Sequence, residues 1–204
     1  YSFCMCPGGF IVPAATASGE VVVNGMSPSR RNNKFANSGI VVEINIDKDI
    51  PKYDQFGPLK GLEYQKNLER LAFTAGGRTQ TAPAQRLVDF VDGKLSSNLN
   101  ETSYQPGLNS APMHSLLPKL IGSRLRKGFE AFGRKMHGYY TNEANIVGVE
   151  SRTSSPVNIP RKENLEHPEI KGLFPCGEGG GYAGRIISAA MDGERCAEAA
   201  IELL

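Results

Sequence analysis

The stretch from Gly172 to Gly193, GLFPCGEGGGYAGRIISAAMDG, has the residue types best suited to chemistry in this sequence. Gly179, Gly181 and Gly184 have G-x-G-x-x-G spacing, which is typical of a turn that holds a dinucleotide phosphate on backbone N–H groups. A helix that starts at such a turn presents free N–H groups and partial positive charge, which suit an anion or a carbonyl oxygen. Glu178 follows an apolar run and can accept hydrogen bonds from hydroxyl groups.

This match does not predict the main ADP-binding turn. That turn needs a second parallel strand with an acidic residue about twenty positions further on. The helix predicted from near Tyr182 instead runs to the end of the sequence. The turn either contacts a cofactor in another way or is an ordinary β–α corner whose glycines allow close packing. The helix is expected to bury one apolar face, made of Ile186, Ala190, Gly193, Ala197, Ile201 and Leu204.

Cys4 and Cys6 are candidate catalytic residues, because residues i and i+2 of a strand point to the same face, so both thiols could meet one pocket. The C-x-C spacing is one residue shorter than a redox C-x-x-C, and a disulfide between them would be strained. Cys176 and Cys196 show no partner spacing, so no metal site is expected. The two thiols are therefore either small buried core residues or neighbours of a bound cofactor.

Residues 119–135 are expected to form an amphipathic helix with a basic face. Its cations, set against Glu130 alone, are Lys119, Arg124, Arg126, Lys127, Arg134 and Lys135. One interpretation is the solvated face of a helix in a cap or substrate domain. The other is a surface for an anionic substrate or RNA, with Tyr139 and Tyr140 stacking on bases.

The helices and strands that must position these residues are expected to form an α+β fold. Short β-branched runs between glycines, asparagines and serines predict strands within residues 1–46, and ANIVGVESR predicts a strand over 144–152. Helices are expected from Leu59 to Ala75, ended by Gly76–Gly77, and from Met113 to Lys135 with a break at Pro118. A short helix is expected within 82–91, and strand, turn and helix in the closing segment.

The charge and hydropathy of the chain limit which classes of function it can have. The chain has 204 residues, with 23 Lys and Arg against 21 Asp and Glu, so a net charge of +2 argues against a bulk polyanion partner. No apolar stretch approaches the eighteen or so residues needed to span a bilayer. The start YSFCMCPGGF lacks the layout of a signal peptide. Four cysteines in a chain of this size need not form a disulfide framework, so a reducing cytoplasm is expected. The chain begins within a predicted strand, which suggests a piece of a longer polypeptide.

At the level of whole motifs, the closing segment resembles the last flavin-binding segment of two-dinucleotide-fold flavoproteins. The chain is similar to the C-terminal half of uncharacterised FAD-dependent dehydrogenases. The shared stretches are FCMCPGG, VVVNGMS, ANSGIVV, GLEYQKNLERLAF, GGRTQTAPAQRLVDF, ESRTSSPVNIPR and the closing segment. They cover nearly the whole length in the family's order, while the ADP-binding glycine turn lies upstream in that family and is absent here.

The resemblance implies a set of FAD contacts in this chain. Gly177 and Glu178 would meet the ribityl hydroxyls, and the helix N-terminus would stabilise negative charge on the reduced flavin. One thiol of Cys4 and Cys6 would lie beside the flavin. The residues expected along the flavin edge are Gly180, Gly181, Tyr182, Ala183 and Gly184. Arg152, Thr153 and Ser154 would face the flavin or substrate from a strand and the loop after it. The alternative is that these three residues only cap the end of the strand.

These observations together predict an α+β fragment of an FAD-dependent oxidoreductase that transfers hydride between an organic substrate and flavin N5. Residues 1–165 would be a mixed-sheet substrate or cap domain, and residues 166–204 the terminal strand–helix unit of a Rossmann-like FAD domain. Part of residues 1–46 would pack near that unit. The expected partners are the N-terminal FAD-binding part of the same polypeptide, a small-molecule substrate and, as a further candidate, a second copy. The alternative is a non-redox module that binds nucleic acid or another anionic ligand.

Overall fold

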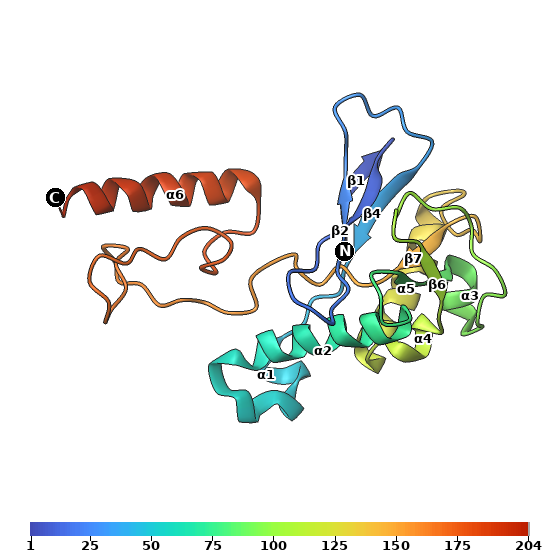
Figure 1. Ribbon diagram of the computed structural model, residues 1–204, viewed down its shortest axis with the longest axis horizontal. Helices are drawn as coiled ribbons and strands as arrows, with labels where there is room; N and C mark the ends of the chain where they lie inside the picture. Colours follow the sequence, from blue (N-terminus) through green and yellow to red (C-terminus); the bar gives the residue numbers. More distant parts are fainter. Residues whose placement is uncertain (204) are drawn as a thin grey trace. The chain divides into compact units, whose positions relative to one another are not determined.

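The computed structural model describes residues 1–203, without the side chains of Phe3 and Cys4. Its small sheets and helices confirm the predicted α+β class (Figure 1). The chain divides into two compact units. Unit 1 comprises Tyr1–Asp49 and Lys66–Ser151, and unit 2 comprises Ile50–Gln65 and Arg152–Leu204. The predicted division at residue 165 into cap and FAD domains remains a prediction.

The strands of unit 1 form two antiparallel pairs and one mixed sheet. The first pair is β1 (Ser2–Pro7) with β4 (Ala36–Ile40), and the second is β2 (Phe10–Pro13) with β3 (Val23–Met26). In the mixed sheet, β5 (Ala82–Arg86) lies between β6 (Leu108–Ser110), which is parallel to it, and β7 (Asn145–Val147), which is antiparallel. The expectation of a mixed sheet is therefore confirmed.

The helices predicted at 59–75 and 113–135 begin and end close to the predicted positions, as α2 (Lys60–Ala75) and as α4 (Met113–Leu116) followed by α5 (Lys119–Lys135). The other helices are α1 (Ile46–Asp49), the 3-10 helix η1 (Pro51–Leu59), α3 (Leu87–Asp92) and α6 (Ile186–Ile201). Helices η1 and α6 belong to unit 2, and α2 begins in unit 2 and continues into unit 1. The break at Pro118 separates α4 from α5, as expected for a residue that lacks an N–H. The helix expected within 82–91 begins only at Leu87. Residues 82–86 pair on both sides as the buried strand β5 instead.

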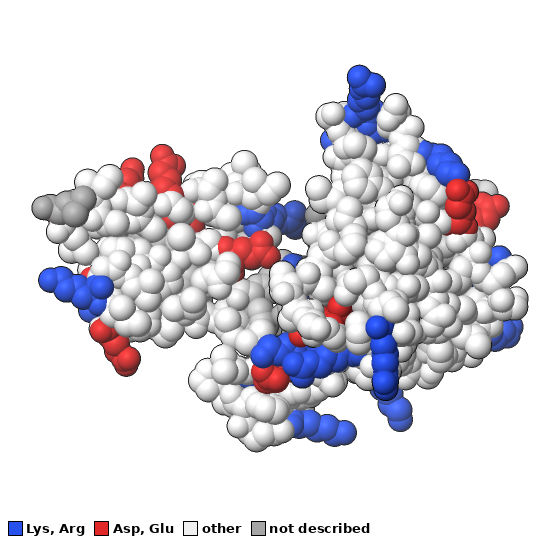
Figure 2. Space-filling model, in the orientation of Figure 1, with Lys and Arg blue, Asp and Glu red and all other residues white. Residues whose placement is uncertain are grey.

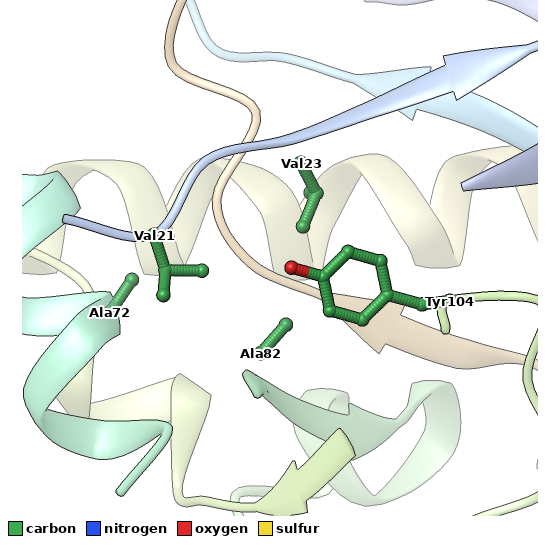
Figure 3. Packing of buried hydrophobic residues seen from close by; sticks show 5 residues of the cluster. All are labelled: Val21, Val23, Ala72, Ala82 and Tyr104. Atoms are coloured by element: carbon green, nitrogen blue, oxygen red, sulfur yellow. The ribbon is translucent and has the colours of Figure 1, made fainter. Parts of the chain in front are cut away.

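One hydrophobic cluster of unit 1 gathers around Tyr104. Figure 3 shows Val21, Val23 and Ala82 near its ring and hydroxyl and Ala72 next to Val21, and all five residues are buried. The Tyr104 hydroxyl donates a hydrogen bond to the Gln80 carbonyl oxygen at 2.7 Å, so the phenol is buried without leaving its O–H unsatisfied. The cluster joins α2 to the mixed sheet through side chains far apart in the sequence.

A second cluster of unit 1 holds α3, α4 and α5 together. Its buried members are Leu87, Phe90, Met113, Leu125 and Phe129. The rings of Phe90 and Phe129 meet edge to face, with centroids 6.0 Å apart, which adds a specific aromatic contact to the apolar burial. The apolar stripe predicted for residues 119–135 is thus the face of α5 that enters this core.

In unit 2, the face of α6 that is buried differs from the predicted one. Ile186 is 87% exposed and Ile201 67% exposed, whereas Asp192 and Cys196 are buried. The predicted apolar face was wrong because polar contacts of Asp192, described below, orient the helix. Leu204, the last member of the predicted face, lies outside the described residues.

Candidate functional site

The glycine turn of unit 2, residues 176–184, is reached through an irregular segment and not through the predicted strand. Within the described chain, residues 172–177 pair with no neighbouring strand, and their polar groups bond elsewhere. The His167 N–H donates to the Leu173 carbonyl at 2.7 Å, and the Arg161 guanidinium donates to the Pro175 carbonyl at 3.0 Å. Helix α6 then begins at Ile186 instead of near Tyr182.

The turn is closed by its own backbone hydrogen bonds. The Gly181 N–H donates to the Glu178 carbonyl, and the Tyr182 N–H donates to the Gly177 carbonyl, both at 3.0 Å. Gly177 and Gly181 have φ angles of +68° and +85°, a backbone region that residues other than glycine rarely adopt. Both glycines are therefore required by the shape of the turn itself.

A second segment, residues 155–161, packs against the turn. The Ile159 N–H donates to the Gly180 carbonyl at 3.1 Å, and the Tyr182 hydroxyl donates to the Ile159 carbonyl at 2.8 Å. A Cβ on Gly181 would lie 2.7 Å from the Val157 carbonyl oxygen. Real Cβ atoms essentially never come so close to another heavy atom, so a side chain here would force the backbone to shift. The close approach at Gly181 is thus made by the chain itself, a contact that the sequence pattern did not reveal.

Arg161 joins this segment to α6. Its Nη2 lies 2.7 Å from Asp192 Oδ1 and its Nη1 lies 3.0 Å from Asp192 Oδ2, a bidentate pair whose side chains are 10% and 7% exposed. The Gly177 N–H also donates to Asp192 Oδ2 at 2.9 Å. The Arg161 guanidinium lies over the Tyr182 ring, 3.6 Å from its centroid. We call these four residues, Gly177, Arg161, Tyr182 and Asp192, the arginine clamp.

The clamp keeps both ionised groups charged. Hydrogen bonding to Arg161 lowers the pKa of the Asp192 carboxyl, and the Gly177 N–H acts in the same direction. Asp192 in turn raises the pKa of Arg161. Sequence reasoning missed both residues, although an aspartate within the otherwise small and apolar run ISAAMDG is a signal that could have indicated a buried partner.

The remaining residues predicted to contact the flavin differ in how open they are to a ligand. Glu178 is exposed, and Ala183 is partly buried. A Cβ on Gly184 would meet no heavy atom within 4 Å, so its backbone is open to approach. Gly180 is instead packed on the Cys176 backbone. At the start of α6, the Ser188 hydroxyl accepts from the Arg185 N–H at 3.1 Å.

Arg152, Thr153 and Ser154 follow β7 in an irregular segment. The strand expected over 144–152 ends at Val147, so none of the three lies on a strand. Arg152 and Thr153 are partly buried and Ser154 is exposed. The next residue, Ser155, brings the segment to the glycine turn: its hydroxyl lies 3.4 Å from the Gly179 carbonyl. Their role toward a cofactor remains a prediction.

Cys6 is buried near the end of β1 in unit 1. The pairing of β1 with β4 is irregular between Phe3 and Cys6, and the Cys4 side chain lies outside the described residues. The expectation that both thiols face one pocket is therefore untested. The glycines that follow serve the chain itself, because a Cβ on Gly8 would collide with the Arg31 backbone.

The basic residues of α5 are partly engaged within unit 1. Arg124 Nη1 donates to the Glu43 carbonyl at 2.9 Å, and Arg126 Nε donates to the Phe90 carbonyl at 3.1 Å. On the face that Figure 2 shows, basic and acidic side chains are interspersed. Unit 1 also contains a cleft of about 490 Å³, whose lining includes Tyr1, Val42, Lys48, Arg124 and Phe132.

Two absences hold for the described residues 1–203. No helix there is long and apolar enough to cross a bilayer. Nor do three or more His, Cys, Asp or Glu side chains meet there in a way that could hold a metal ion.

The family described as "FAD-dependent protein, C-terminal domain-like" matches residues 1–153. The chain belongs to this family. The FAD-dependent C-terminal domain-like match covers all of unit 1, whereas the glycine turn lies beyond it. An uncharacterized protein of Clostridium beijerinckii is 42% identical over 204 residues, which include the turn. This alignment covers 99% of the present chain and 38% of the relative, so the chain spans about two-fifths of that relative's length.

Proposed function

We propose that the chain supplies the substrate domain and one wall of the flavin site of an FAD-dependent oxidoreductase. In this reaction, hydride passes between an organic substrate and flavin N5. Membership of the FAD-dependent family supports the cofactor class. The observation that carries the assignment to a site is the exposed Glu178 carboxylate on a glycine turn that the arginine clamp fixes against α6.

The residues of the turn fit the ribityl and ring end of the cofactor. Gly179 and Gly184 have open space where a Cβ would lie, so a flat ring can approach the backbone there. Glu178 is an exposed acceptor for ribityl hydroxyls. Gly177 and Gly181 also give the turn its positive φ angles, and Gly180 and Gly181 pack against the chain's own backbone. Their contact with the flavin edge and the ribityl chain remains part of the proposal.

When bound, FAD supplies two-electron redox chemistry at its ring. The chain's own contribution is to bind and orient. The Glu178 carboxylate would accept hydrogen bonds from the ribityl hydroxyls, and the N-terminal turn of α6 would offer partial positive charge to the ring end of the cofactor. The arginine clamp holds Gly177 in place and so fixes the position of the neighbouring Glu178.

The pyrophosphate and adenosine are proposed to bind outside this chain, in the remainder of the longer polypeptide. A relative of which the chain spans 38% leaves ample length for a first β–α–β unit. The organic substrate is proposed to bind to unit 1, whose cleft has a volume within the ordinary range of ligand sites, about 300–1,000 Å³. By itself the chain should bind FAD weakly, in the high micromolar range.

The test is Glu178→Ala in the longer polypeptide. Loss of a charged hydrogen bond should cost about 1.5–3 kcal/mol, which weakens FAD binding roughly tenfold to a hundredfold. Glu194→Ala, which removes an exposed carboxylate from α6, is the matched control and should leave the flavin dissociation constant unchanged. Equal FAD affinity in the Glu178 variant and the wild type would remove Glu178 from the site. Sub-micromolar FAD binding by the 204-residue chain alone would place the complete site here.

A further inference from the structure

Two thiols that the sequence gives no reason to pair come together in unit 2. Cys176 is the first residue of the glycine turn, and Cys196 lies on α6 twenty residues later. Both are free thiols. They come together because the residues before and after Cys176, Pro175 and Gly177, both contact the same face of α6.

The contacts that flank Cys176 show this directly. After it, the Gly177 N–H donates to Asp192 Oδ2 at 2.9 Å. Before it, the Pro175 carbonyl oxygen lies 3.9 Å from Cys196 Sγ. Asp192 and Cys196 are four residues apart, so they occupy one face of α6. Cys176 is therefore held over the helix surface between these two side chains.

The two thiols differ in access and environment. Cys176 is exposed, whereas Cys196 is only 4% exposed. Burial raises the pKa of the Cys196 thiol, and the charge of Asp192 and the neighbouring Cys176 thiol raise it further, while the charge of Arg161 opposes them. Arg161 Nη1 lies 3.4 Å from Cys196 Sγ and donates to it, so a cation stands beside this sulfur.

We propose that Cys176 and Cys196 form a reversible disulfide when the protein meets hydrogen peroxide, which makes this pair an oxidative modification site beside the glycine turn. The exposed Cys176 thiol gives up its proton and its sulfur attacks peroxide, forming an S–O bond as the O–O bond breaks; the leaving hydroxide takes up the proton and departs as water. The Cys196 thiol then gives up its proton and its sulfur attacks the Cys176 sulfur, forming the S–S bond as the S–O bond breaks; this hydroxide takes up the second proton and departs as the second water. Two thiols and one peroxide thus give one disulfide and two waters, and a dithiol restores the thiols.

The disulfide would tie the start of the glycine turn covalently to α6, alongside the arginine clamp. Cys176 directly precedes Gly177 and Glu178, so the oxidation state of the pair would govern how freely that part of the turn moves. Formation of this disulfide needs only the two thiols and peroxide, so it does not depend on whether the turn binds flavin.

The experiment exposes the chain to hydrogen peroxide, alkylates remaining thiols and maps tryptic peptides by mass spectrometry. Cleavage after Lys171, Arg185 and Arg195 separates peptide 172–185 from peptide 196–204. The expected result is a cross-linked pair of these two peptides, with loss of alkylation at both cysteines. Treatment with a dithiol should restore both labels.

Two variants make the result decisive. Cys196→Ser should leave Cys176 oxidised to sulfenic or sulfinic acid without a cross-link, and Cys176→Ser should leave Cys196 fully alkylated. Overoxidation of Cys176 in the wild type with Cys196 still alkylated would overturn the proposal. So would a cross-link between two copies of peptide 172–185, or one to the peptide that contains Cys4 and Cys6.

Discussion

In unit 1 the largest fully buried side chains include Tyr104, Phe90 and Met113, whereas the buried side chains around α6 in unit 2 are Arg161, Asp192 and Cys196. Unit 1 is thus built around apolar clusters that its own helices and strands supply. Unit 2 is organised by a charged pair, while the apolar residues Ile186, Ile187 and Met191 of its helix are exposed. The difference teaches that polar contacts, and not an apolar face, orient α6 in unit 2, and that the same contacts shape the candidate flavin turn.

The largest expected effect comes from breaking the arginine clamp. Arg161→Ala should cost about 3–5 kcal/mol of the stability of unit 2, because it leaves a buried aspartate charge without its partner. Hydrogen exchange measured by mass spectrometry should show loss of protection in α6 and in residues 175–182, with unit 1 unchanged. Arg161→Lys keeps the charge but loses the bidentate contact and the flat stacking on Tyr182, so it should lie between. Unchanged protection of α6 in Arg161→Ala would refute the comparison.

The matching test in unit 1 removes apolar volume. Leu87 is 4% exposed and Leu95 is 59% exposed, so the same substitution can be made inside and outside the core. Leu87→Ala should cost about 2–5 kcal/mol through lost burial and a cavity. Leu95→Ala should change stability by less than about 0.5 kcal/mol. Chemical denaturation, followed by hydrogen exchange in residues 66–151, checks both; equal effects would contradict an apolar core at Leu87.

The comparison also explains which parts of the fold could be predicted from the sequence. Helices α2 and α5 carry an apolar stripe at helical spacing, and a glycine stop or a proline break sets their limits, so local pattern sufficed. The strand in residues 82–86 was predicted as part of a helix because its pairing partners are more than twenty and more than fifty residues away. Such long-range pairing leaves no local signal.

In unit 2 the apolar pattern of α6 pointed to the wrong buried face. Its stripe, with Ile186 and Ile201, is the stronger local signal, but the contacts that orient the helix in the structure come from Arg161 and Gly177 to Asp192. A polar tertiary contact overrode the hydrophobic pattern. The sequence did identify the glycine turn, yet it could not show that Val157 and Asn158 fill the space beside Gly181.

A smaller effect should separate the glycines that shape the turn from one that leaves it open. Gly181→Ala places a side chain at a φ of +85° and against the Val157 carbonyl, so it should cost about 1–3 kcal/mol of local stability. Gly184→Ala meets no atom within 4 Å and should be nearly neutral. Local hydrogen exchange in residues 155–184 measures both. Equal protection in the two variants would show that Gly181 is not held as described.

The smallest expected effect is a pH dependence confined to unit 1. His114 Nδ1 lies 2.9 Å from Gln85 Nε2, and in the neutral ring this nitrogen accepts a hydrogen bond from the buried amide. Burial lowers the pKa of His114 below its usual value of 6.5, and the charge of Arg126 lowers it further. The unfolded chain therefore binds a proton more readily than the folded chain between the folded pKa and 6.5. The stability of unit 1 should be level above this window and fall as the pH drops through it.

The measurement is the denaturation midpoint of unit 1, followed by hydrogen exchange in residues 66–151, at about pH 7.5 and at about pH 5. His114→Gln removes the titrating ring, so its midpoint should change less between the two pH values than that of the wild type. His137→Gln is the control, because it removes an exposed histidine of the same unit that makes no contact with Gln85, and it should keep the wild-type slope. An identical slope in the His114 variant would place the origin of the pH dependence elsewhere. In unit 2, the lowered pKa of Asp192 means that the contribution of the arginine clamp should be lost only at much lower pH, as that carboxylate becomes protonated.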